Sequence, residues 1–344
     1  MSRILKVAAL QLGPVHATDT KPEVIDRHIR LLRSAASQGV RLAVLPELAF
    51  TTFFARHLFP DDVSLSSYLE HDLEVAKSEF FSRLFREAGD LGIDLCVGYA
   101  ERTPDGRTFN SSVYFSATTN EIIAKYRKVH IPGTREPLKD GSGAHHLEKR
   151  YFEPGDLGFE AFRAPNVGEH PGSDGRKDAI MGMLICNDRR WPEAWRCYGL
   201  QGVELILCGY NTPGYNPAFW GTTDSPDPEK AETRIMAQHK LVVQANSYMN
   251  SCFTVAAGKA GLEDGVHRLI GGSCIVSPDG DVLAEAVTEG DEVIVAEIDL
   301  DDCIPGKSKI FNFGEHRQVD KYSRIVDQVG VREPPALVAS TAGT

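Results

Sequence analysis

Just past its midpoint the chain has the sequence Met181-Gly182-Met183-Leu184-Ile185-Cys186-Asn187-Asp188-Arg189-Arg190-Trp191-Pro192-Glu193. An apolar strand here runs directly into a thiol, two arginines and a helix start led by proline. Strand ends are where α/β proteins place reactive groups, because the sheet fixes the backbone while the side chain emerges at the rim. Nearby positive charge and a helix N-terminus both favour the thiolate. Cys186 is therefore a candidate nucleophile, although a cysteine taken alone is more often a small core residue.

The segments around this stretch predict an α/β fold. Residues 180–186, 191–201 and 204–208 form a strand, a helix and a strand, and the capping box Thr20-Lys21-Pro22-Glu23 opens a helix that reaches Gly39. Further helices are predicted at residues 78–91 and 227–246, and further strands at residues 7–12, 42–45, 94–99, 110–116, 121–129, 253–257, 273–276, 282–286 and 293–298. Because hairpins interrupt the alternation, we expect two mixed sheets stacked face to face, each covered outside by helices.

A second candidate site residue is a carboxylate at the end of another predicted strand. The apolar residues 42–45 are followed by Pro46, which ends strand pairing because it has no N–H, and then by Glu47. A carboxylate at the edge of an apolar layer is a candidate general base, with its pKa raised by desolvation. The alternative is a solvated glutamate at a strand end.

A third segment, Tyr126-Arg127-Lys128-Val129-His130, places Lys128 and His130 on one face of a strand. Taken alone, a basic strand face usually points to solvent.

Together the three segments resemble the nitrilase superfamily of carbon–nitrogen hydrolases, which has a glutamate, a lysine and a cysteine in this order and in these settings. The resemblance covers residues 5 to 320 and is closest to the N-carbamoyl-D-amino acid amidohydrolases (D-carbamoylases). It implies a nitrilase-like four-layer α-β-β-α sandwich of two mixed sheets. The supporting segments are residues 46–54, 146–159, 186–193, 209–213 and 310–313.

The resemblance also implies roles for individual residues. Cys186 would attack the carbonyl carbon, Glu47 would act as the base, and Lys128 with the backbone N–H of Asn187 would hold the developing oxyanion. Glu148 would keep Lys128 protonated and hold the substrate amine. From sequence alone we would instead place Glu148 on the surface. His146 and His130 are expected beside the substrate, as residues that order carboxylates or carbonyls.

The substrate class follows from the arginine pair. Arg forms bidentate contacts with carboxylates, so Arg189 and Arg190 beside the nucleophile suggest a carboxylate next to the reacting carbonyl. An N-carbamoyl amino acid has this shape, and Asn211 is the expected additional contact. One of the two arginines could equally pair within the protein. D-selectivity is implied by the resemblance alone. The alternatives are a carbamoylputrescine or β-ureidopropionate hydrolase, and a binding scaffold without activity.

Two segments depart from the D-carbamoylase pattern. Residues 164–178 form a longer Gly/Pro-rich stretch, which we expect to loop out at a subunit contact or pocket rim. Gln238 stands beside His239 where that family has consecutive histidines.

Composition limits the partners. The 344 residues are 42% hydrophobic and 25% charged, as in soluble globular proteins, and the net charge of −11 disfavours nucleic acid or an anionic membrane as a partner. No apolar run is long enough to span a membrane. The seven cysteines lack close pairs and metal-site spacing, which indicates a cytoplasmic, reduced protein without metal or cofactor.

We predict one catalytic domain at residues 1–330 and an extended or disordered tail at 331–344. The resemblance implies a homodimer or homotetramer. We expect residues 310–313 to lie extended on a neighbouring subunit, since Phe311 and Phe313 alternate with Asn312.

Overall fold

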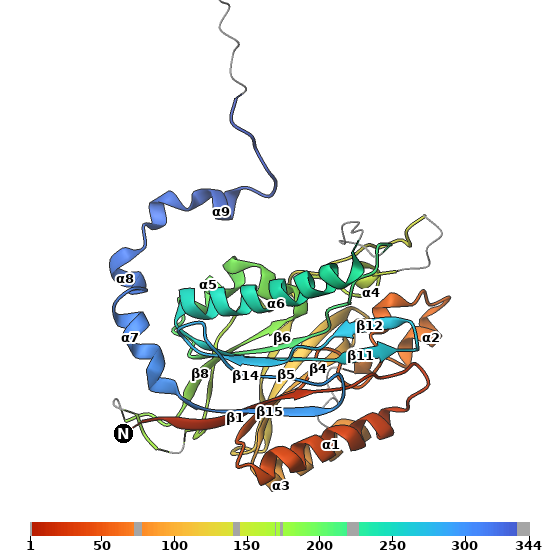
Figure 1. The fold of residues 1–344 in the computed structure, drawn as a ribbon, viewed down its shortest axis with the longest axis horizontal. Helices are drawn as coiled ribbons and strands as arrows, with labels where there is room; N and C mark the ends of the chain where they lie inside the picture. Colours follow the sequence, from red (N-terminus) through yellow and green to blue (C-terminus); the bar gives the residue numbers. More distant parts are fainter. Residues whose placement is uncertain are drawn as a thin grey trace, which may run out of the picture.

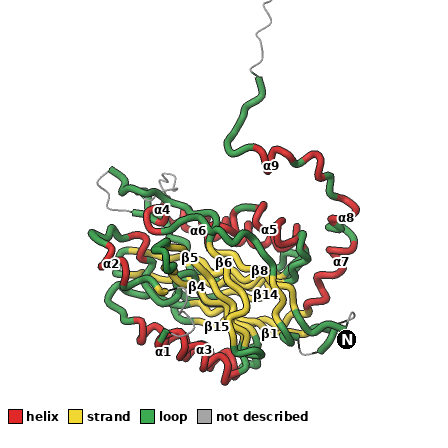
Figure 2. Tube along the Cα trace, turned by 180° about the vertical axis from the view of Figure 1, so that it is seen from behind, coloured by secondary structure: helices red, strands yellow, loops and turns green. Residues whose placement is uncertain are grey.

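The computed structural model describes residues 2–71, 78–139, 145–168, 170–172, 175–218 and 227–335. Two β-sheets lie face to face at the centre, with helices against both outer faces (Figure 1). In the view from behind, the strands form a central block with helices on either side (Figure 2). The predicted four-layer α-β-β-α sandwich is confirmed.

The first sheet has seven strands within the described residues, in the order β15-β1-β2-β4-β5-β6, with β3 paired to β4. It is mixed, because β1, β2 and β4 run parallel while β15, β5 and β6 are antiparallel to their neighbours. Its strands are β1 (Ile4–Gln11), β2 (Leu42–Val44), β3 (Glu70–His71), β4 (Asp94–Arg102), β5 (Thr108–Ser116), β6 (Glu121–Arg127) and β15 (Glu292–Asp299). The last predicted strand therefore returns to pair with the first.

The second sheet has six strands within the described part of the chain, in the order β14-β13-β10-β9-β8-β7. Strands β8, β9 and β10 are parallel, and the outer pairs are antiparallel. Its strands are β7 (Phe162–Ala164), β8 (Ala179–Ile185), β9 (Leu205–Tyr210), β10 (Phe253–Gly258), β13 (Cys274–Val276) and β14 (Val282–Glu285). The carboxyl ends of β8 and β9 thus lie side by side, whereas in the first sheet the end of β2 pairs with Cys96 and β4 continues beyond it to Arg102.

The helices cover the sheets with their apolar faces. On the first sheet α1 begins at the predicted capping box, in which Thr20 and Glu23 satisfy each other's backbone N–H, and α3 begins at the cap Ser78. The outer core of this side lies between α1, α3 and the sheet, and a second core fills the space between the sheets and under α5 and α6. The main helices are α1 (Lys21–Ser37), α3 (Glu79–Leu91), α5 (Pro192–Gly199) and α6 (Pro228–Asn250), with short helices α2 (Asp62–Ser66) and α4 (Glu148–Tyr151).

One hairpin was not predicted. Strands β11 (Ala260–Glu263) and β12 (His267–Ile270) form a separate two-stranded sheet, and Leu269 of β12 also bridges to Pro213. They are short, and Gly261 and Asp264 both have positive φ, so this segment lacks the alternation of a longer strand.

The C-terminal part leaves the sandwich. The short helices α7 (Cys303–Ser308), α8 (Phe313–His316) and α9 (Ser323–Asp327) run along its edge and then away from it (Figure 1). Residues 310–313 do not form one extended segment as predicted, because Phe313 begins α8. The Phe311 ring meets Tyr248 edge-on at 5.0 Å, and Arg196 lies 4.1 Å from the Phe313 ring. Residues 331–335 have no regular structure and are exposed. The rest of the predicted tail lies outside the described residues.

Candidate active site

Glu47 lies between the two sheets, in the turn after β2. This position is possible because two facing residues are glycines: a Cβ at Gly98 would lie 2.9 Å from Glu47 Cα, and a Cβ at Gly209 would lie 2.8 Å from the Glu47 nitrogen. The carboxylate is completely buried and accepts hydrogen bonds from Asn110 Nδ2 at 2.7 Å and from the backbone N–H of Asn211 at 2.9 Å. A solvated glutamate is thereby excluded.

Lys128 is also completely buried, one residue beyond β6. Its backbone N–H still donates to Asn110 O at 2.8 Å, so the strand pairing continues to this residue. The ammonium donates to Glu47 Oε1 at 2.7 Å and to Glu148 Oε2 at 2.6 Å. Burial alone would lower the pKa of Lys128, but the two carboxylates outweigh it and raise that pKa, so the ammonium stays charged.

Glu148 is the first residue of α4 and is buried, not at the surface as sequence alone suggested. Its Oε1 lies 2.8 Å from His146 Nε2. Burial opposes its ionisation, yet Lys128 and His146 lower the pKa of Glu148 well below the ordinary value. The pKa of Glu47 moves the other way, because burial and the charge of Glu148 outweigh Lys128. Of the two carboxylates around Lys128, Glu47 is the one that binds a proton more readily.

Cys186 follows β8 and has a φ of 48°, the left-handed conformation that non-glycine residues rarely adopt. Its side chain is 5% exposed, and the thiol donates to Asn211 O at 3.4 Å. Burial and the Glu47 carboxylate raise the pKa of Cys186, with Lys128 and Arg189 acting in the opposite direction. The sequence predicted a lowered pKa, and that direction is wrong because desolvation outweighs the nearby cations. The thiol therefore needs a base, and Glu47 is the carboxylate beside it.

Asn211 connects Glu47 and Cys186 through hydrogen bonds. It follows β9, its Nδ2 donates to Glu47 O at 2.7 Å, and its carbonyl oxygen accepts from the thiol. The structure thus brings the strand ends of β2, β6, β8 and β9 to one point, and with them Glu47, Lys128 and Cys186, as the resemblance implied. Asn110 was missed by the sequence reasoning, because it lies within strand β5 and no motif marks it.

The two adjacent arginines have different surroundings. Arg189 is completely buried, and its guanidinium donates to Cys186 O at 2.6 Å and Thr212 Oγ1 at 2.6 Å. Its Nε also lies 3.2 Å from His239 Nδ1, so α6 reaches the site through His239. Arg190 is exposed, and its Nη1 donates to Asn187 Oδ1 at 3.3 Å. The neighbouring charge of Arg189 is the main reason that the pKa of Arg190 is lowered to about 10, which leaves it charged at neutral pH.

The remaining predicted site residues surround this cluster. Asn187 donates through Nδ2 to His130 O at 3.1 Å. The His130 ring does not face Lys128, since its Nδ1 lies 2.8 Å from Asp188 Oδ1 and it stacks on Trp191 with a centroid distance of 4.9 Å. His146 lies close to the cluster through Glu148.

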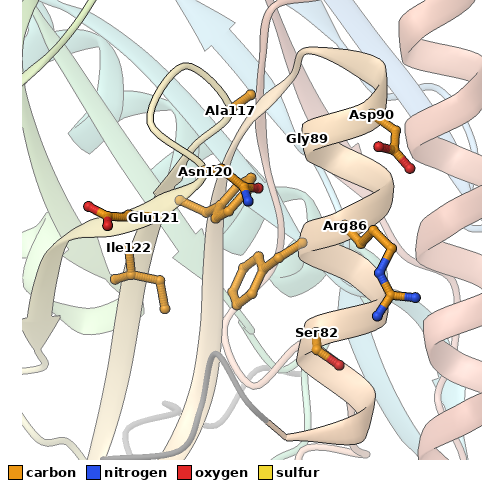
Figure 3. A pocket seen from close by; sticks show the side chains of 10 residues that line it. Ser82, Arg86, Gly89, Asp90, Ala117, Asn120, Glu121 and Ile122 are labelled. Atoms are coloured by element: carbon orange, nitrogen blue, oxygen red, sulfur yellow. The ribbon is translucent and has the colours of Figure 1, made fainter.

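Other features lie apart from this site. A surface pocket of about 440 Å³ between α3 and the β5–β6 hairpin includes none of the predicted site residues (Figure 3).

Among the described residues, no three His, Cys, Asp or Glu side chains are grouped as they would be to hold a metal ion. In the same part of the chain, no helix combines the length and the apolar character needed to cross a membrane. All seven cysteines are described, and none forms a disulfide.

This fold and this cluster define a class of protein. Residues 6–307 match the family model described as carbon-nitrogen hydrolase. The chain belongs to the carbon–nitrogen hydrolase family, the nitrilase superfamily, and is an enzyme that acts on amide-type C–N bonds.

Similar proteins come from several branches of the family. An N-carbamoylputrescine amidase of Oryza sativa is 27% identical, over 87% of this chain and 87% of the relative. A nitrilase of Pyrococcus abyssi is 29% identical, over 86% and 90%. A citrullinase of Francisella tularensis is 26% identical, over 86% and 89%. The crystal structure of a carbon-nitrogen hydrolase from Helicobacter pylori superimposes with a TM-score of 0.75 and 26% identity, over 95% of this chain and 99% of that one. The superfamily is thus established, while the D-carbamoylase subfamily stays a prediction.

Proposed function

We propose that this enzyme hydrolyses N-carbamoyl-D-amino acids to the D-amino acid, carbon dioxide and ammonia. The observation that supports this reading is Arg190, an exposed and charged guanidinium four residues after Cys186. Arg189, by contrast, is already bound to Cys186 O and Thr212. Arg190 is therefore the arginine that we assign to the substrate carboxylate, which an N-carbamoyl amino acid has close to its reacting carbonyl.

The proposed chemistry has two halves. Glu47 takes the thiol proton, and the Cys186 sulfur attacks the ureido carbonyl carbon. Lys128 and the backbone N–H of Asn187 stabilise the oxyanion. Glu47 then gives its proton to the departing ammonia, which leaves a thiol-bound carbamoyl intermediate. In the second half Glu47 deprotonates a water molecule, which attacks the carbonyl carbon of the intermediate. The C–S bond breaks, Glu47 returns the proton to the Cys186 sulfur, and the released N-carboxy amino acid loses carbon dioxide to give the amino acid.

Glu148 acts in this scheme through Lys128. With its pKa lowered, it stays ionised and keeps the ammonium charged throughout the cycle. Glu47 is then free to exchange its proton while Lys128 does not. The preference for the D-enantiomer rests on the resemblance of the chain to D-carbamoylases.

A second candidate is hydrolysis of N-carbamoylputrescine, which the relatives named N-carbamoylputrescine amidase favour. The charge of Arg190 argues against it, because the far end of that substrate is a cationic amine. A β-ureido acid such as β-ureidopropionate keeps the carboxylate but places it one carbon further away.

The test is a substrate panel read by ammonia release: N-carbamoyl-D- and L-amino acids, N-carbamoyl-β-alanine, N-carbamoylputrescine and simple amides. We expect the highest kcat/KM for N-carbamoyl-D-amino acids. A higher value for N-carbamoylputrescine would replace our proposal with the second candidate. Equal values for acids and simple amides would refute the role given to the carboxylate.

A further inference from the structure

A buried carboxylate outside the catalytic cluster links two of its segments. Asp188 lies two residues after Cys186 and is completely buried. Its oxygens form no hydrogen bond with the side chains of Glu47, Lys128, Glu148 or Cys186. Instead, both accept hydrogen bonds from chain segments that lie on either side of it.

The first segment is the one that holds the nucleophile. Asp188 Oδ2 accepts from the backbone N–H of Ile185 at 3.2 Å, the residue immediately before Cys186. This bond closes a tight turn around Cys186, whose φ of 48° is unfavourable for a residue with a side chain. Such a conformation persists only where neighbouring groups hold it.

The second segment is the one that holds Lys128. Asp188 Oδ2 also accepts from the Tyr126 hydroxyl at 2.8 Å, and Oδ1 accepts from the His130 backbone N–H at 2.8 Å. Tyr126 and His130 stand two residues before and two residues after Lys128. A single carboxylate is therefore hydrogen-bonded to the chain on both sides of Lys128 and to the residue that precedes Cys186.

A carboxylate suits this role because each of its two oxygens can accept hydrogen bonds. Its two oxygens here face the donors of Ile185, Tyr126 and His130, with His130 Nδ1 as a fourth close group at 2.8 Å. An asparagine at this position would turn an NH₂ group toward one pair of donors and lose at least one bond.

We propose that Asp188 is a positioning residue that fixes the distance between the Cys186 thiol and the Lys128 ammonium. The inference rests on the proposed chemistry, in which the sulfur and the ammonium act on the same carbonyl group. A displacement of about 1 Å between groups that must act together can cost roughly a hundredfold in rate.

The chain offers a matched control. Asp94, at the start of β4, is also a buried carboxylate that accepts from a tyrosine hydroxyl, Tyr114 at 2.6 Å, and from a backbone N–H, Ala117 at 2.8 Å. These contacts hold the first sheet and do not involve the site. Asp188→Asn and Asp94→Asn therefore remove similar bonds at different places.

The main readout is the rate of alkylation of Cys186 by iodoacetamide as a function of pH, in a Cys197→Ser background because Cys197 is exposed. We expect both variants to have lowered melting temperatures. Only Asp188→Asn should change the alkylation profile, and its kcat should fall by about tenfold to a hundredfold with KM nearly unchanged. An alkylation profile and kcat like those of Asp94→Asn would overturn the inference.

Two further measurements keep the test decisive. If Asp188→Asn does not fold, Tyr126→Phe removes one of the bonds and should change the profile in the same direction, whereas Tyr114→Phe should not. In a Lys128→Met background, Asp188→Asn should have a smaller effect on the alkylation profile. The ammonium is then absent, so the distance between it and the Cys186 thiol can no longer affect the thiol. Additive effects would contradict the proposal. Alkylation needs no substrate, so a failed substrate panel would refute the proposed function without touching this result.

Discussion

Lys128 Nζ lies 2.7 Å from Glu47 Oε1, and both side chains are completely excluded from solvent. An ammonium at this distance normally lowers the pKa of a carboxylate. Here burial and the second carboxylate, Glu148, prevail, and the pKa of Glu47 is raised. The site thus contains a fixed positive charge next to a carboxylate that can still accept a proton, which is the combination that an acid–base step requires.

The raised pKa of Glu47 predicts where activity is lost in acid. Below this pKa Glu47 is protonated and cannot take the thiol proton, so kcat/KM falls as the pH decreases. We expect this acid limb to lie above 4.5, the ordinary glutamate value. A pH profile of kcat/KM, which reports the free enzyme, measures it.

Glu148→Gln tests the cause of that shift. The variant removes a negative charge that raises the pKa of Glu47, so the acid limb should move to lower pH while kcat also decreases. Asp62→Asn, which neutralises an exposed carboxylate, is the control and should leave the limb in place. A limb that stays or moves upward in Glu148→Gln would show that another group controls it.

The parts of the site that were predictable from sequence are those at strand ends. Glu47 and Cys186 each follow an apolar strand, and such a boundary is visible locally in the chain. Lys128 comes directly after the mixed strand β6, inside the stretch predicted as a strand, and the resemblance to a family was needed to assign its role. Glu148 has no such mark, because it opens a helix of four residues in a long irregular stretch. Only the resemblance to a family pointed to it.

The two arginines show what sequence could not decide. Arg189 and Arg190 are adjacent, yet the first is buried and the second is exposed. The left-handed φ of Cys186 and the 3₁₀ turn at Cys186–Arg190 determine which way each arginine side chain points. Neither feature follows from hydrophobic periodicity. The bonds of Asp188 to Tyr126 and His130 likewise join residues about sixty positions apart.

Replacement of Cys186 should abolish turnover without unfolding the chain. Cys186→Ser and Cys186→Ala remove the thiol from a position that the sheet fixes, and a serine hydroxyl does not ionise near neutral pH. We expect melting temperatures close to that of the wild type and no measurable ammonia release. Cys197→Ser, at an exposed position, should keep full activity. Turnover by purified Cys186→Ala would rule out a thiol-bound intermediate.

The C-terminal part of the chain leads us to predict that copies of this protein associate with one another. Between helix α8 and residue 331, several apolar side chains are exposed to solvent. Among them, Ile325 has an exposed fraction of 62% and Val326 of 86%. We expect a dimer or tetramer of the 37.8 kDa chain in solution, with this part against a second copy. Multi-angle light scattering at micromolar concentration measures the mass.

A pair of double variants locates the contact. Ile325→Asp/Val326→Asp should reduce the assembly, because it places charge on the proposed interface. Val63→Asp/Val287→Asp changes two equally exposed valines elsewhere and should not. A wild-type monomer, or an equal effect of both double variants, would refute the interface.

The last prediction separates the two arginines. If Arg190 binds the substrate carboxylate, Arg190→Lys loses a bidentate charge-assisted contact worth roughly 1.5–3 kcal/mol, so KM should rise about tenfold to a hundredfold. Some loss of kcat should accompany it, because the carboxylate lies next to the reacting centre.

Arg189→Lys should behave differently. Arg189 donates to Cys186 O and Thr212 inside the protein, so its replacement should lower the melting temperature while KM of the folded enzyme stays nearly unchanged. An N-carbamoyl amino acid amide, which lacks the carboxylate charge, completes the test. It should bind poorly to the wild type and show little further loss with Arg190→Lys. If neither variant distinguishes the acid from the amide, the substrate is not held by its carboxylate, and a neutral or cationic carbamoyl compound becomes the better candidate.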